Sequence, residues 1–116
     1  MKYLTTMLDD SLIEDFKDDY LLIKQNFKEK GIDFNDTEEY VFSNHIVCLL
    51  KRLKSGELID PIDEEMMKEI DYDVFDLTEK CIEPIFKKYN LEISRSEVFL
   101  VATHIQMNKI RKEEKK

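Results

Sequence analysis

The sequence predicts an all-α protein, folded as a compact bundle of four or five helices. The 116 residues include only two glycines and two prolines, far fewer turn residues than a β-rich fold needs. Apolar residues, which make up 42% of the chain, recur at intervals of three and four positions, the period of an α-helix. Because the connections between the expected helices are short, neighbouring helices should pack as antiparallel pairs.

The first expected helix begins at Asp10 or Ser11 and ends at Gly31. Ser11 and Glu14 have the spacing of a capping box at its start, and Gly31 can adopt the left-handed conformation that ends many helices. One face of this helix is apolar and should be buried. Its residues are Leu12, Phe16, Tyr20, Ile23 and Phe27.

The second expected helix begins between Asn35 and Thr37 and stops at Gly56. The glycine follows the polar segment KRLKS, which is typical of a helix C-terminus. We expect four side chains of this helix to be buried against the rest of the bundle. These are Tyr40, Val41, Leu49 and Leu53.

Up to three further helices are expected after the Pro-marked segment ELIDPID. The segment DEEMMKEI should form a short helix whose acidic residues lie at its positive end. A longer helix should run from about Tyr72 to Tyr89, and Pro84 should kink or split it. The last helix should run from about Glu97 to Arg111, with Ser94 or Ser96 as its N-terminal cap.

The chain is long enough to bury one core and too short for two, so we expect one domain. We assign residues 10–112 to this helical domain, residues 1–9 to an N-terminal extension and residues 113–116 to a charged C-terminal tail. The first residues lack the long apolar run of a signal peptide. No segment is long and apolar enough for a membrane span.

The formal net charge of −8 argues against nucleic acid and against an anionic membrane surface as direct partners. Cys48 and Cys81 have no CxxC spacing and do not suggest a disulfide framework, so we expect reduced thiols and a cytoplasmic location. The residues form no recognisable catalytic triad and no Gly-rich phosphate loop. We therefore expect neither an enzyme nor a bound cofactor.

His45 lies in the apolar segment SNHIVCLLKR, and Arg52 follows it by seven residues. In a helix this spacing places the two side chains on one side, about 20° and about 10 Å apart. A neutral imidazole that solvent can reach could accept a phosphoryl group, and a guanidinium could bind the dianion that forms. The same two residues also suit a buried histidine and an arginine that compensates the helix dipole.

His104 lies in a second apolar segment, VFLVATHIQM, and shares a helix face with Glu97 and Arg111. Glu97 precedes the histidine by seven residues, so it could orient the imidazole only from two turns away. It could instead bind the backbone amides at the start of the helix. From the residues alone, His104 suits the core at least as well as it suits a functional site.

Together these two segments resemble the histidine motifs of the PTS regulation domain (PRD) family. NHIVCLLKR is similar to the first motif, in which a histidine is followed by an aliphatic residue and, seven positions on, by an arginine. EVFLVATHI is similar to the second motif, in which a glutamate opens a helix seven residues before a histidine–aliphatic pair. The resemblance covers nearly the whole chain, from Asp10 to Arg111.

This resemblance implies a five-helix bundle of PRD type, which usually dimerises and is not an enzyme. By matching position, His45 and His104 are the expected phosphoryl acceptors, and the donors are the phosphocarrier protein HPr or enzyme II components of sugar transporters. Arg52 is the expected phosphate-stabilising residue. Asn44 stands where the family often has aspartate, and its amide could orient the imidazole but supplies no charge.

Family members usually carry two such domains fused to a module that binds RNA or DNA and regulates transcription, whereas this chain has one. The output should therefore run through a homodimer or a partner protein. Two alternatives remain open: a PRD-like module that is not phosphorylated and only binds protein, and a structural metal site. The metal site would use two histidines and two cysteines, namely His45, Cys48, Cys81 and His104.

Overall fold

The computed structural model describes residues 10–114, with side chains from residue 16 onward. These residues form five α-helices and no strand, so the prediction of an all-α five-helix bundle is confirmed. The expected N-terminal extension lies outside the described residues, whereas the last helix extends two residues past the expected domain end. The helices are α2 (Asp10–Glu29), α3 (Asp36–Ser55), α4 (Glu64–Met67), α5 (Tyr72–Lys88) and α6 (Arg95–Glu114).

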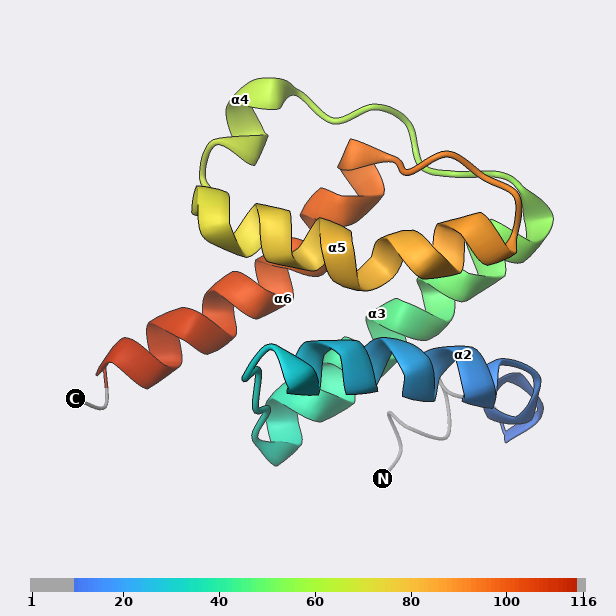
Figure 1. The fold of residues 1–116 in the computed structure, drawn as a ribbon, viewed down its shortest axis with the longest axis horizontal. Coiled ribbons are helices and arrows are strands. Elements are labelled where there is room, and N and C mark those ends of the chain that lie inside the picture. The colour runs from blue at the N-terminus through green and yellow to red at the C-terminus, as the bar shows by residue number, and fades with distance from the viewer. Residues whose placement is uncertain (1–9, 115–116) are drawn as a thin grey trace.

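The four long helices form a closed arrangement in which each packs against two others. Helix α2 contacts α3 and α5, and α6 contacts α3 and α5. Figure 1 shows α2 and α5 running in opposite directions in front of α3 and α6, which also run in opposite directions. The expected antiparallel pairs are therefore present. No helix in the described part of the chain has the length and apolar character that crossing a membrane requires.

Helix α3 begins and ends where its capping residues direct. The Asn35 side chain accepts a hydrogen bond from the Glu38 amide at 2.8 Å, and the Glu38 side chain accepts one from the Asn35 amide at 3.0 Å. This capping box satisfies two amides that the helix leaves free. At the other end, Gly56 adopts the left-handed conformation with φ 78° and donates to the Arg52 carbonyl.

The buried face of α3 differs from the predicted one at Val41, which is 45% exposed. The core-facing side chains include Phe42, Ile46, Leu49 and Leu53, which recur at three- and four-residue intervals. Val41 lies outside this stripe, on the flank of the helix, so the prediction that it is buried was wrong. The Phe42 ring packs edge-on against Phe27 of α2, with ring centroids 5.5 Å apart.

Two other expectations concerned helix boundaries. Pro84 lies inside α5 without splitting it, because the proline is exposed on the surface, where water can bind the carbonyl that loses its amide partner.

Helix α6 begins at Arg95, two residues before the expected start. Of the two candidate caps, Ser94 accepts a hydrogen bond from the Glu97 amide at 3.2 Å. Ser96 instead accepts one from the Ile62 amide at 2.8 Å.

A buried carboxylate joins α2 to the end of α5. Asp19 is only 5% exposed. It accepts a hydrogen bond of 2.6 Å from the Tyr89 hydroxyl and forms an ion pair with Lys88. Burial, together with the hydrogen bond to the charged Asp19, raises the pKa of Tyr89 to about 12. The hydroxyl therefore keeps its proton, and can donate it to Asp19, at neutral pH.

Replacement of Tyr89 by Phe should lower the free energy of unfolding by about 2 kcal/mol, because a buried carboxylate loses one of its donors. The matched control is Tyr72→Phe, since Tyr72 is 86% exposed and should change stability by less than about 0.5 kcal/mol. Urea unfolding of both variants at pH 7 measures the difference. Equal stabilities for the two variants would contradict the role given to Asp19.

Candidate functional site

The antiparallel packing of α3 on α6 brings the two histidines into contact. The His45 ring from α3 and the His104 ring from α6 lie with their centroids 4.8 Å apart and their planes tilted by 58°. Both side chains are half-buried, and the Phe42 ring meets the His104 ring edge-on at 6.3 Å. The sequence identified both histidines as candidates but gave no indication that they touch.

The surroundings of the pair keep both imidazoles neutral. Burial, together with the nearby His104 and Arg52, lowers the pKa of His45 to about 4, while Glu97 opposes the shift. Burial also lowers the pKa of His104. The ring nitrogen Nε2 of His45 is buried and has no hydrogen-bond partner among the described residues. The expectation that solvent reaches the His45 ring therefore fails for this nitrogen, because the ring faces α6 across the helix contact.

Arg52 is bound by a carboxylate of the other helix. Its Nε donates to Glu97 Oε2 at 2.8 Å and its Nη2 donates to Oε1 at 2.7 Å, which makes a two-pronged ion pair. Glu97 is fully buried, whereas the Arg52 side chain is 25% exposed. A guanidinium carries five N–H donors, so the pair with Glu97 leaves donors of Arg52 available for another anion.

Glu97 has a second partner that the sequence did not predict. Its Oε2 accepts a hydrogen bond from the Ile59 amide at 3.2 Å, and the neighbouring Ser96 accepts from the Ile62 amide. Glu97 was expected to orient a histidine or to bind amides of its own helix start. It binds instead an arginine of α3 and an amide of the α3–α4 connection, because the antiparallel contact sets the start of α6 beside the end of α3.

A similar polar cluster joins the other ends of the same two helices. Arg111 Nε donates to Glu38 Oε2 at 2.7 Å, and Asn108 donates to Glu38 Oε1 at 3.0 Å. Asn108 and Arg111 also donate to the Asp33 carbonyl in the α2–α3 connection, at 2.8 and 3.2 Å. The histidine pair therefore lies between two clusters, each of which ties α3, α6 and one connection together.

The remaining candidates do not join the histidine pair. Asn44 is 8% exposed, and its side-chain oxygen has no hydrogen-bond partner among the described residues, so its orienting role stays a prediction. Cys48 is exposed, and burial raises the pKa of Cys81 to about 11. Within residues 10–114, no group of three or more His, Cys, Asp or Glu side chains is placed to hold a metal ion. The four-residue metal site is therefore not assembled.

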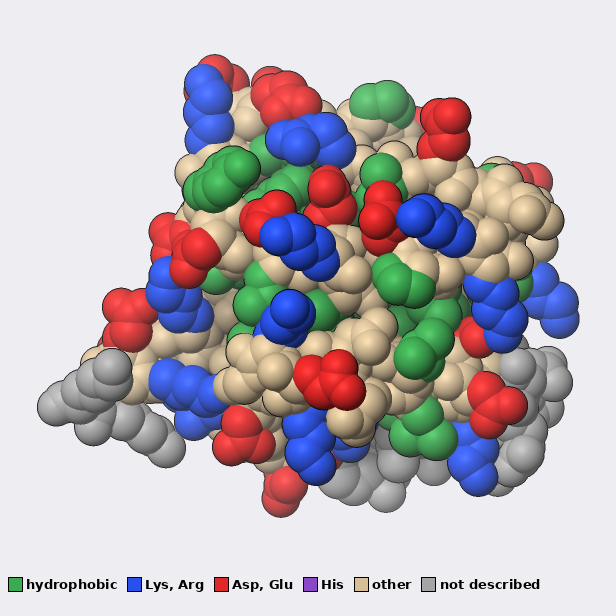
Figure 2. Space-filling view, viewed as in Figure 1, with side chains coloured by type: hydrophobic (Ala, Val, Ile, Leu, Met, Phe, Trp, Pro, Cys, Tyr) green, Lys and Arg blue, Asp and Glu red, His purple; other side chains and the backbone are tan. Residues whose placement is uncertain are grey.

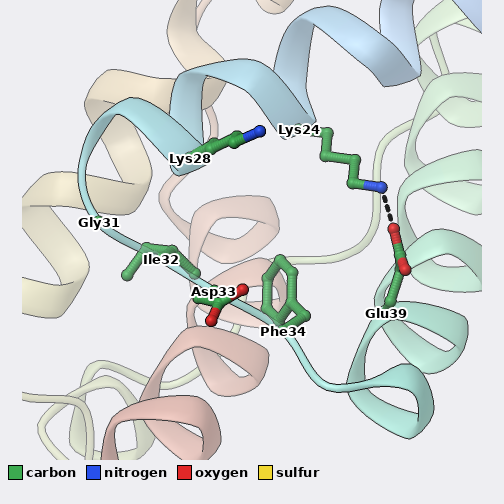
Figure 3. A pocket seen from close by; sticks show the side chains of 7 residues that line it. All are labelled: Lys24, Lys28, Gly31, Ile32, Asp33, Phe34 and Glu39. Atoms are coloured by element: carbon green, nitrogen blue, oxygen red, sulfur yellow. Dashed lines mark hydrogen bonds and ion pairs between the residues drawn. The ribbon is translucent and has the colours of Figure 1, made fainter.

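A cavity of about 380 Å³ lies between the end of α2 and the start of α3 (Figure 3). Its wall includes Lys24, Lys28, Phe34 and Glu39, and Lys24 forms an ion pair with Glu39. Neither histidine lines this cavity. On the face shown in Figure 2, acidic and basic side chains are interspersed and no histidine is visible. The histidine pair is thus separate from this cavity and absent from this face.

Residues 20–108 match the PRD domain family. The match covers both histidines, Arg52 and Glu97, and most of the chain, so this chain belongs to the PRD family. PRD domains are regulatory domains of the phosphotransferase system (PTS) that are phosphorylated on histidine. No curated protein and no solved structure matches the chain.

The lowered pKa of His45 predicts a loss of stability in acid. Because the folded protein holds this pKa near 4, below the 6.5 of a free histidine, the unfolded chain binds more protons between these values. The contribution of the neutral His45 ring to the free energy of unfolding is complete above pH 6.5. It is lost as the pH falls toward 4, by at most about 3 kcal/mol. His104 acts in the same direction.

Urea unfolding at pH 7, 5.5 and 4.5 tests this for the native protein and for His45→Gln. The native protein should lose more stability on acidification than the variant, which has no imidazole at position 45. The carboxylates are common to both proteins, so their contribution cancels in the comparison. Parallel pH profiles would show that the His45 ring protonates as easily in the folded protein as in the unfolded chain.

Proposed function

We propose that this PRD domain is a cytoplasmic regulatory domain, not an enzyme, that accepts phosphoryl groups on His45 or His104 from HPr or from an enzyme II component. The observation that carries the proposal is the contact between two imidazoles whose pKa values are both lowered. A neutral imidazole has the free electron pair that a phosphoryl acceptor needs, and a protonated one does not. Both rings therefore retain a nucleophilic nitrogen at neutral pH.

The transfer needs no further reactant. The lone pair of an unprotonated ring nitrogen forms the new N–P bond, the bond between phosphorus and the donor atom breaks, and its electron pair stays with the donor. The product carries about two negative charges on three acceptor oxygens. In a chain whose formal net charge is already −8, this group needs a cation, and Arg52, two turns further along the same side of α3, is the candidate for His45.

We also propose that the domain signals as a homodimer whose interface covers the histidine pair. Val41, four residues before His45, is 45% exposed, and Met107, three residues after His104, is 64% exposed. At these spacings each apolar side chain lies on the same side of its helix as the histidine. A second copy would bury both side chains, and a new dianion beside them would change the dimer affinity. This change, or a partner that senses it, would carry the signal to transcription.

Two observations favour a second candidate, a PRD-like module that is not phosphorylated and only binds protein. The Arg52 guanidinium is engaged by Glu97, and Nε2 of His45 is buried. Both features suit a histidine pair that serves packing alone. The two candidates differ in a single measurable property, the transfer of a phosphoryl group.

We expect labelled phosphate to pass to this protein from phosphorylated HPr or from a phosphorylated enzyme II B domain. The label should be acid-labile and base-stable, as N-phosphohistidine is. His45→Ala and His104→Ala should each keep part of the label, and the double variant should keep none. If the native chain takes no label from any cognate donor, phosphoryl acceptance is excluded and the binding module stands.

Placing a charge at the proposed interface should weaken the dimer. Val41→Asp and Met107→Asp should raise the dimer dissociation constant by about tenfold or more, because each buries an unpaired carboxylate. Leu21→Asp on α2 is the matched control, since Leu21 is 47% exposed and not adjacent in sequence to either histidine. Sedimentation equilibrium measures all three. An effect of Leu21→Asp alone would place the interface elsewhere.

A further inference from the structure

Helices α3 and α6 carry the same three residue types at the same spacing. In each helix a glutamate is followed after seven residues by a histidine and after seven more by an arginine. Seven residues are close to two helical turns, so the three side chains lie on one side of their helix. The residues are Glu38, His45 and Arg52 in α3, and Glu97, His104 and Arg111 in α6.

The antiparallel contact joins these two series end to end. Arg52 pairs with Glu97 at 2.7 Å, the two histidine rings meet in the middle, and Arg111 pairs with Glu38 at 2.7 Å. The two arginine side chains are almost equally exposed, at 25% and 26%. The site thus has two halves of the same composition, each with a histidine, an arginine two turns further along the same helix, and a glutamate from the opposite helix.

We propose that Arg111, held by Glu38, is the phosphate-binding residue for His104, as Arg52 is for His45. This inference rests on the proposed function, because it assumes that His104 accepts a phosphoryl group. Arg111 lies beyond residues 20–108, the part of the chain that matches the PRD family, so the assignment comes from the structure and not from the family motif. Helical side chains lean toward the N-terminus, which directs the Arg111 guanidinium back toward position 104.

Arg111 is also the easier of the two arginines to recruit. If Arg111 turned to a phosphoryl group, Glu38 would keep its hydrogen bonds from the Asn35 amide and from Asn108. Glu38 is 19% exposed, so water can replace the lost donor. Burial raises the pKa of Glu38, but the hydrogen bonds from Arg111, the Asn35 amide and Asn108 outweigh burial and lower it, and the last two would remain if Arg111 moved away.

Release of Glu97 by Arg52, the corresponding change in the half of the site around His45, costs more free energy. Glu97 is fully buried. If Arg52 left it completely, the Ile59 amide would be the one hydrogen-bond donor from outside α6 that its carboxylate keeps among the described residues. A buried carboxylate with so few donors is strongly disfavoured. Arg52 should therefore reach a phosphoryl group with its spare N–H donors while keeping Glu97, whereas Arg111 can move away from Glu38.

Chains with a single acceptor test this assignment. His45→Ala leaves His104 as the acceptor, and His104→Ala leaves His45. Arg111→Gln is placed in both chains. It should shorten the lifetime of the label on His104 by about fivefold, and it should shorten the lifetime of the label on His45 by less. Arg52→Gln should show the reverse order. Arg111→Lys should keep part of the lifetime that Arg111→Gln loses, since lysine supplies the charge without the two-pronged hydrogen bonding of a guanidinium.

Lys109→Gln is the matched control in the His104 chain, because Lys109 is another α6 cation paired with a carboxylate, Asp71, at 2.8 Å. Equal effects of Arg111→Gln and Lys109→Gln would overturn the proposal. So would equal effects of Arg111→Gln on the two histidines. Circular dichroism checks that each variant keeps its helix content.

A second measurement needs no phosphoryl donor, so it separates failure of this inference from failure of the proposed function. His104→Glu places a carboxylate at position 104, and NMR can follow the Nε–Hε signal of Arg111. The signal should shift in His104→Glu and remain in place in His45→Glu, where Arg52 is the neighbour. An unchanged signal in His104→Glu would overturn the role of Arg111 even if His104 takes up phosphate. Absence of label with a shifted signal would overturn phosphoryl acceptance alone.

Discussion

The antiparallel contact between α3 and α6 determines where every candidate site residue lies. Two polar clusters fix the register of this contact, one formed by Arg52 and Glu97 and the other by Arg111 and Glu38. A shift of α6 by one helical turn would separate both ion pairs at once and leave Glu97 buried without its arginine. The histidines lie midway between the clusters, so the same register places their rings in contact.

Burial and charge give this contact its chemical character. Burial, together with the neighbouring His104 and Arg52, disfavours a proton on His45, which lowers its pKa to about 4. The resulting neutral ring is suited to accept a phosphoryl group and poorly suited to form an ion pair. Losing one partner of a buried ion pair such as Arg52–Glu97 typically costs about 3 kcal/mol, so the pair holds the arginine near the histidines.

Most of the fold could be predicted from the sequence, because helix period and capping residues are local. Asn35, Gly56 and Ser94 act at the helix ends where their chemistry suggested. The site could be predicted only in part, since the partner of a side chain depends on which helices pack. The two Glu–His–Arg series were visible in the sequence, but their pairing follows only once α3 and α6 are known to be antiparallel. Val41 was misplaced for a related reason: apolar character alone does not separate a buried face of a helix from an exposed one.

The central claim is that His45 and His104 are a pair of neutral imidazoles in contact. The most direct measurement is the imidazole ¹H–¹⁵N spectrum of the protein followed from pH 8 to pH 4. This account predicts that His45 titrates near pH 4, that His104 titrates below the 6.5 of free histidine and that the signals of the two rings respond to each other. Two independent titrations near the 6.5 of free histidine would contradict it.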